Sequence, residues 1–189
     1  MSGEISEKLW REARAVEALV FEAFKGVTRE GGVSWHEAYA IDFSLTDEES
    51  DLERAKDREQ SWEELLNDVK WRDQVGDWYW PFFDAIGFSY YLAPALIHSL
   101  RGGGDEFFIY ALGIGKGGYQ TGWFELCTPQ QRHVVARFLR WQLVCNAELP
   151  RWGVERQQLM IAYRSGWDEW DLGGGEMEEL MPKRRRNGG

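Results

Sequence analysis

Asp84 is the ionisable residue whose sequence surroundings most suggest chemistry. It begins the run DAIGFSYYLAPALIHSL, residues 84–100, in which the other side chains are mostly apolar or aromatic. A buried carboxylate has to find hydrogen-bond partners or shift its pKa. Asp84 could therefore be a general base or a polar anchor in an aromatic pocket, with His98 as a second polar group. The structural alternative, which we favour, is that Asp84 accepts hydrogen bonds at a turn before Phe88.

Other patterns for catalysis or cofactor binding are incomplete. Gly113-x-Gly115-x-x-Gly118 has the spacing of a dinucleotide fingerprint, but no βαβ pattern surrounds it. The three histidines, His36, His98 and His133, are scattered singly, and no cysteine stands near them at metal-ligand spacing. We therefore expect no cofactor and no metal site, assign no catalytic residue, and favour a protein that is not an enzyme.

A second candidate is a surface for binding another protein. The chain has a formal charge of −10, and residues 47–68 hold ten acidic and three basic residues. Such a surface would attract a basic protein partner, whereas nucleic acid would be repelled. The residues that we predict to bind this partner are Glu48, Glu49, Asp51 and Glu53. The alternative is an ordinary solvated helical face.

Helix signals dominate the elements that must position these residues. Leu9, Ala13, Val16, Val20 and Phe24 recur at helical spacing before Gly26. Capping boxes predict three helix starts, and a hydroxyl cap followed by proline predicts a fourth. These starts are Ser34-x-x-Glu37, Thr46-x-x-Glu49, Ser61-x-x-Glu64 and Thr128-Pro129. The helix after Thr46 has few apolar residues and should lie on the surface.

The central segment predicts a small amount of β-structure. We expect a short helix that ends near Gly87, an extended aromatic piece at Phe88–Leu92, and a helix opened by Pro94. Residues 107–112 suit a strand, and the glycines of 113–122 suit the turn of a β-hairpin whose second strand is 123–127. The predicted fold class is α+β, mainly α: one helical domain with a small β-hairpin.

Length and composition fit one domain with a tail. The chain has 189 residues and 11 tryptophans, enough for a core built on large aromatic side chains. We expect a globular domain over residues 1–165 and a flexible tail over 166–189, acidic and then basic. No export signal and no long apolar stretch is visible, which favours a cytoplasmic protein without membrane spans. Oligomeric state stays open.

Two motifs carry a resemblance to a known family. The first is the core F-x-D-x-x-G-F-x-Y-Y-L-x-P-A-L at residues 82–96, and the second is T-P-Q-Q-R-x-x-V-A-R-F-L at 128–139. Together with Asp57-x-x-x-x-Trp62, they resemble a family of small bacterial proteins of unknown function, over residues 18–145. The resemblance implies a bacterial intracellular protein and adds no catalytic residue.

Two functions remain open at this stage. The first, which we favour, is a non-enzymatic acidic domain of the immunity or antitoxin kind that binds a basic protein. The second is a small-ligand binder or enzyme in which Asp84 and a histidine converge on a pocket near the glycines of 113–122. The second requires these residues to lie close together in space.

Overall fold

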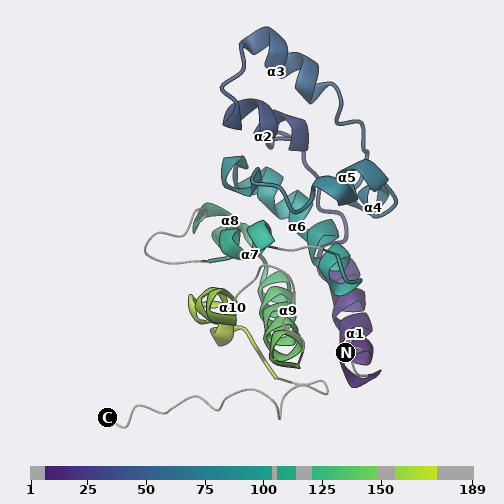
Figure 1. Cartoon of the computed structure of the whole chain (residues 1–189), viewed down its shortest axis with the longest axis vertical. Coiled ribbons are helices and arrows are strands. Elements are labelled where there is room, and N and C mark those ends of the chain that lie inside the picture. Colours follow the sequence, from purple (N-terminus) through teal and green to yellow (C-terminus); the bar gives the residue numbers. More distant parts are fainter. Residues whose placement is uncertain (1–6, 104–105, 114–120, 149–155, 174–189) are drawn as a thin grey trace.

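Helix α6 (Ala85–Leu100) runs through the centre of the molecule in the computed structural model (Figure 1). Twelve of its residues are buried, on every side of the helix. A helix that is apolar all round is stable in water only when other elements cover it. The run that suggested a pocket around Asp84 is therefore the main packing element of the fold.

The structure describes residues 7–103, 106–113, 121–148 and 156–173. Within these ranges every regular element is helical. The remaining helices are α1 (Glu7–Ala23), α2 (Trp35–Asp42), α3 (Asp47–Arg54), α4 (Trp62–Leu65), α5 (Val69–Gln74), the 3-10 helix η1 (Trp80–Phe82), α7 (Glu106–Ala111), α8 (Thr121–Leu126), α9 (Pro129–Glu148), α10 (Arg156–Arg164) and the 3-10 helix η2 (Trp167–Glu169).

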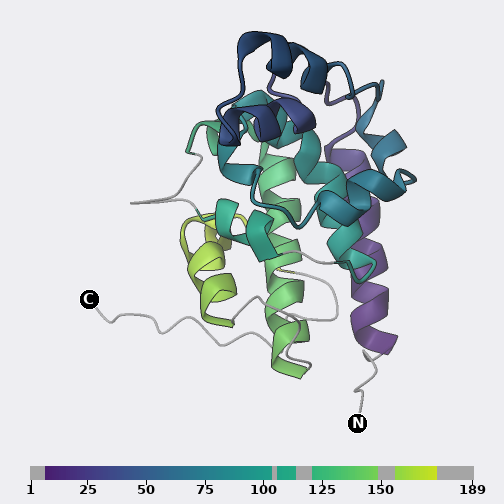
Figure 2. The ribbon, with the colours of Figure 1, turned by 45° about the horizontal axis from the view of Figure 1, so that its top comes forward.

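The long helices α1 and α9 pack beside α6 to form the base of the molecule. Figures 1 and 2 both place α1 and α9 below the α2–α3 pair. A buried ion pair joins the two helices, with Arg137 Nε donating to Glu12 Oε1 at 2.7 Å, and Trp141 Nε1 donates to the Leu9 carbonyl at 2.9 Å. Truncating either partner of a buried ion pair is costly, so this contact helps to fix how α9 sits on α1.

The predicted β-hairpin is wrong, because both of its strands are helices in the structure. In α7, Phe108 and Ile109 are buried with Leu112 just beyond the helix, while Tyr110 is exposed. In the second segment Trp123 and Cys127 are buried and Leu126 is exposed. Both patterns have helical spacing, so burial on one helix face outweighs the β propensity of the aromatic residues. Of the glycine turn between them, residues 114–120 lie outside the described residues.

The predicted break at Gly87 is also wrong, since Phe88–Leu92 and Pro94 all lie inside α6. Proline removes one N–H from the helical ladder, yet the helix continues to Leu100. Gly87 belongs to the first turn of α6, where a Cβ atom would collide with the carbonyl oxygen of Val33. The glycine is therefore required for the close approach of the 31–34 loop.

An aromatic cluster joins α2 and α5 to α6. The Trp35 ring is the centre of this cluster and is almost completely buried. Its centroid lies 5.4 to 5.9 Å from the rings of five neighbours: Trp71, Tyr79, Trp80, Phe83 and Tyr91. Aromatic pairs at this separation add stability beyond the area that they bury. The start of α2 is thus anchored to the core while its far end projects.

The residues after α10 also contribute to the core. Trp167 is fully buried, and its indole N–H donates to the Leu112 carbonyl at 2.8 Å. The predicted division at residue 165 stays a prediction, and residues 174–189 of the predicted tail lie outside the described residues. No described helix combines the length and the apolar character needed to cross a membrane.

Candidate functional site

The N-terminus of α2 is held by three side chains, two from α6 and its N-cap and one from the segment after α3. The backbone N–H of Val33 donates to Asp84 Oδ1 at 3.0 Å, and that of Trp35 donates to Tyr91 Oη at 2.9 Å. The N–H of His36 donates to Asp57 Oδ2 at 2.9 Å. N–H groups at the start of a helix have no backbone acceptor within that helix. Each of these side-chain oxygens therefore satisfies a donor that would otherwise lack a hydrogen bond.

Asp57 and His36 form a close ion-pair or hydrogen-bond contact. His36 Nδ1 lies 2.6 Å from Asp57 Oδ1, and the Asp57 side chain is only 5% exposed. The carboxylate therefore fixes both the backbone and the ring of His36. Such a pair orients an imidazole and is found in catalytic as well as structural settings.

Glu59 is the second nearly buried carboxylate of this region, with 8% of its side chain exposed. Its Oε1 accepts a hydrogen bond from Tyr91 Oη at 2.9 Å and lies 3.5 Å from Arg29 Nη2. The second distance is longer than a good N–H···O hydrogen bond. Burial, followed by the nearby Glu59 and Asp57 charges, raises the pKa of Tyr91, so this hydroxyl stays protonated and remains a donor.

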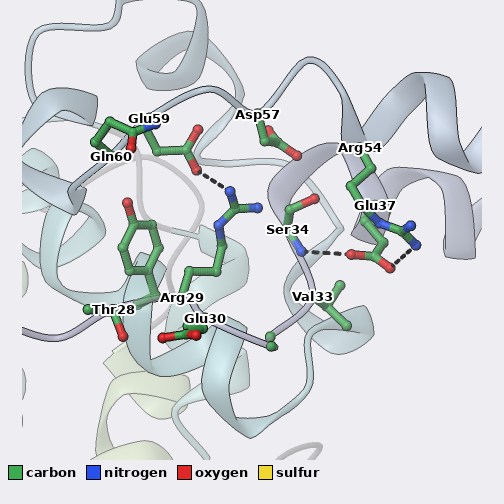
Figure 3. Close-up of a pocket in the computed structure, with 13 residues that line it drawn as sticks. Thr28, Arg29, Glu30, Val33, Ser34, Glu37, Arg54, Asp57, Glu59 and Gln60 are labelled. Carbon is green, nitrogen blue, oxygen red and sulfur yellow. Dashed lines mark hydrogen bonds and ion pairs between the residues drawn. The ribbon is translucent and has the colours of Figure 1, made fainter.

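Asp57, Glu59 and Arg29 line a polar cavity of about 630 Å³ (Figure 3). Its walls come from the 28–34 loop, the start of α2, the end of α3, the 57–60 segment and Tyr90 of α6. Four carboxylates and two guanidinium groups line it: Glu30, Glu37, Asp57, Glu59, Arg29 and Arg54. The volume is within the range of small-ligand sites, but the walls are far more polar than those of a typical apolar pocket.

Glu37 and Arg54 form the firmest ion pair in this wall, with 2.6 Å between Glu37 Oε1 and Arg54 Nη2. Burial alone would raise the pKa of Glu37. The Arg54 hydrogen bond and charge, together with the Ser34 N–H, outweigh burial and lower the pKa below its usual value. Glu37 is therefore a carboxylate at neutral pH and holds α3 against α2.

The Ser34 hydroxyl faces the backbone N–H of Glu37 in a capping box, but the geometry falls short of a regular hydrogen bond. The residue is 1% exposed and lines the cavity. Its Oγ makes no well-formed hydrogen bond within the described part of the chain. A buried hydroxyl in this condition costs free energy that a bound group could recover.

A second cavity, of about 610 Å³, lies on the other side of the 57–59 segment. Asp57 and Glu59 border both cavities, and His36 and Trp71 line the second. The two nearly buried carboxylates thus stand in a thin wall between two hollows. Among the described residues no group of three or more His, Cys, Asp or Glu could hold a metal ion.

The structure does not bring Asp84 and His98 together. Asp84 is the N-cap of α6, where its Oδ1 accepts from the N–H groups of Val33 and Gly87, and His98 lies in the last turn of the same helix. At 1.5 Å per residue, about 20 Å of helix separates them. Asp84 was expected at the end of a short helix and instead begins a long one.

His98 borders a separate hollow of about 140 Å³. Burial, and then the positive charge of Arg72, lower the pKa of His98 below its ordinary value. A His98 that is neutral at pH 7 can accept or donate a hydrogen bond, but no acid or base partner for catalysis lines this hollow. The roles proposed for Asp84 and His98 in a common pocket stay predictions without a shared site.

The four carboxylates predicted to bind a partner all belong to α3, which has no buried residue. Three of them also have contacts within the chain. Glu49 accepts from the Thr46 N–H, Asp51 pairs with Arg54 at 2.9 Å, and Glu53 pairs with Lys56 at 2.5 Å. Glu48 is exposed and has no such contact among the described residues. Their binding role stays a prediction.

Sequence reasoning missed the cavity and most of its residues. Asp57 was noted only as part of a motif, Ser34 only as a helix cap, and His36 only as an isolated histidine. Arg29 and Glu59 carried no signal at all, because the residues that meet here lie on loops up to thirty positions apart.

Comparison with known proteins adds a family and no activity. The family model described as "Family of unknown function (DUF6714)" matches residues 12–106. This is half of the chain, which therefore belongs to that family. The match includes every residue of the polar cavity and ends before the second predicted motif at 128–139. No curated protein and no solved structure matches the chain.

Proposed function

Because the family carries no assigned activity, we propose from the structure that this chain is a non-enzymatic protein-binding module whose docking surface for a basic partner is the α2–α3 hairpin. The observation that carries the proposal is that α3 has no buried residue. This helix is placed at the outer end of the molecule and contributes no residue to the core.

Apolar exposure on the same hairpin supports a protein partner. Leu52 on α3 is 69% exposed, Phe43 at the end of α2 is 58% exposed, and Ile41 is 47% exposed. Large apolar side chains that are exposed together are uncommon on the surface of a monomeric protein, and they often mark an interaction site. Apolar anchors surrounded by charged residues resemble the core and rim of a protein interface.

The charge of the hairpin supports a basic partner. Asp42, Asp47, Glu48 and Asp51 are all exposed there, and Arg54 is shared between Glu37 and Asp51. Attraction between opposite charges speeds association, and added salt screens this attraction. An acidic protein of the immunity or antitoxin kind would use such a surface to bind a cationic target.

The test compares three forms of the tagged protein as baits in extracts of the source organism. They are the wild type, the hairpin variant Glu48→Lys with Leu52→Ser, and the control Glu22→Lys with Ile161→Ser. The control also changes one exposed glutamate and one exposed apolar residue, on α1 and α10. Circular dichroism establishes that all three are folded.

We expect one basic protein to bind the wild type and the control in stoichiometric amount and to elute as salt rises. The hairpin variant should bind this protein at least about tenfold more weakly, because it loses an apolar anchor and reverses a charge. Equal binding by the hairpin variant, or no basic protein bound to the wild type at low salt, contradicts the proposal.

A further inference from the structure

We propose that the polar cavity of Figure 3 is a site for the guanidinium group of an arginine side chain, supplied by the basic partner. The identity of the occupant rests on the proposed function. The presence of a guanidinium site in the cavity rests on the charge, burial and hydrogen bonding of its walls.

The sign of the wall charge favours a cation. The four carboxylates outnumber the two guanidinium groups, so the lining carries a formal charge of −2. Asp57 and Glu59 are the least exposed of these carboxylates, at 5% and 8%. A buried carboxylate is stable only if it is paired or richly hydrogen-bonded.

Arg29 and His36 are the cationic groups that contact these two carboxylates among the described residues, while Lys56, Arg58 and Lys70 line the second cavity that the carboxylates also border. Arg29 Nη2 is 3.5 Å from Glu59, and His36 neutralises Asp57 only when its imidazole is protonated. Arg54 is engaged elsewhere, by Glu37 and Asp51. The cavity therefore has room for one more positive charge close to the 57–59 segment.

Ser34 provides a second, independent indication of a bound group. Its hydroxyl is buried in the same wall and has no well-formed hydrogen bond among the described residues. Figure 3 shows Ser34 below Asp57 in this view, with its backbone N–H bonded to Glu37. Rotation of the Ser34 side chain would turn this buried oxygen toward a guanidinium group lying between Asp57 and Glu59, which has five N–H donors in one plane.

An organic cation fits better than a metal ion. The described residues contain no group of three or more metal-ligating side chains, and about 630 Å³ is much more space than a bare ion fills. The cavity wall already binds two guanidinium groups of this chain. Glu37 pairs with Arg54 at 2.6 Å, and the Arg29 guanidinium carbon lies 5.9 Å from the centroid of the Tyr90 ring. The face of the Tyr90 ring can attract the guanidinium group of a ligand through the same kind of cation–π contact.

The access to the cavity suits a side chain that reaches in from outside. Thr28, Glu30 and Gln60 at its rim are exposed. Arg54 at the end of α3 also lines it, so the cavity is continuous with the hairpin that we propose as the docking surface. A partner lying along α3 could insert one arginine without rearrangement of the core.

The experiment uses N-acetyl-arginine amide as the probe and N-acetyl-citrulline amide as its neutral match. Backbone amide shifts of the ¹⁵N-labelled full chain are followed by NMR at low salt. We expect a dissociation constant of about millimolar for the arginine probe, with shifts at residues 29–37 and 57–60, and binding of the citrulline probe at least about tenfold weaker.

Two cavity variants and one control variant locate the site. Glu59→Gln keeps an oxygen for the Tyr91 hydroxyl but removes the charge, and it should weaken binding of the arginine probe about tenfold or more. Ser34→Ala should weaken it about fivefold, since it removes one hydrogen bond. The control Glu22→Gln makes the same charge change on exposed α1 and should leave the affinity unchanged.

The inference is overturned if the two probes bind equally, if the shifts map outside the cavity, or if Glu59→Gln binds as tightly as the wild type. Failure of the proposed function looks different. In that case the arginine probe still binds in the cavity and responds to Glu59→Gln, while the hairpin variant captures the same proteins as the wild type.

Discussion

Replacing Asp84 tests whether this carboxylate acts as a structural clamp. Its Oδ1 accepts two backbone N–H groups, from Gly87 at 2.8 Å and from Val33 at 3.0 Å. Asp84→Ala removes an N-cap bond, at about 1 kcal/mol, and leaves a second N–H near the core unpaired, at about 1 to 3 kcal/mol. The unfolding free energy should therefore fall by about 2 to 4 kcal/mol. Asp84→Asn keeps an acceptor oxygen and should cost about 1 kcal/mol or less.

Asp68 supplies a matched control. It is also an N-cap whose Oδ1 accepts two backbone N–H groups, from Lys70 and Trp71, but both bonds stay within α5 and the residue is exposed. Asp68→Ala should cost about 1 kcal/mol. Urea unfolding followed by circular dichroism measures all three variants. The clamp is refuted if Asp84→Ala costs no more than Asp68→Ala, or if Asp84→Asn is as damaging as Asp84→Ala.

Three further predictions follow from burial. Gly87→Ala should lower the unfolding free energy by about 1 to 3 kcal/mol, because the new Cβ atom would collide with the Val33 carbonyl oxygen. Gly76 has open space around it, so Gly76→Ala should leave the unfolding free energy nearly unchanged. Urea unfolding of both variants measures the difference. Since burial lowers the pKa of His98, the unfolded chain binds a proton more readily, so stability should fall as the pH drops below about 6.5, and urea midpoints between pH 8 and 5 should depend less on pH in His98→Asn. Burial raises the pKa of the Cys127 thiol to about 12, so its alkylation by iodoacetamide at pH 8 should be at least about a hundredfold slower in the native protein than in urea, and comparable rates would contradict its burial.

Local signals in the sequence located five of the helix starts in the described residues, those of α1, α2, α3, α4 and α9. The expected helix over Leu9–Phe24 is α1, and the caps at Ser34, Thr46 and Ser61 precede α2, α3 and α4. Proline after a hydroxyl cap correctly predicts α9 from Pro129. The prediction that the helix after Thr46 lies on the surface is confirmed. These helix signals depend only on residues within one or two helical turns. They can therefore be recognised in the sequence without knowledge of the tertiary structure.

The sequence-based prediction failed where a segment is buried on several sides. The α6 run has apolar residues all round, so no amphipathic period distinguishes a helix from an extended aromatic piece there. Gly87 and Pro94 are helix breakers in isolation, and the packing of α6 against its neighbours overrides both. In residues 107–112, burial along one face of α7 outweighed the β propensity of the aromatic residues.

The sequence by itself determined the starts of α1, α2, α3, α4 and α9, the acidity of α3 and the membership of the chain in a family of unknown function. Only the tertiary structure decided what the polar residues do. It separated Asp84 from His98 by the length of a helix and turned Asp84 into a clamp on the 31–34 loop. It also gathered Asp57 and Glu59 around a cavity, because hydrogen bonds and charge pairs depend on distance in space, and residues on different loops meet only after the helices have packed.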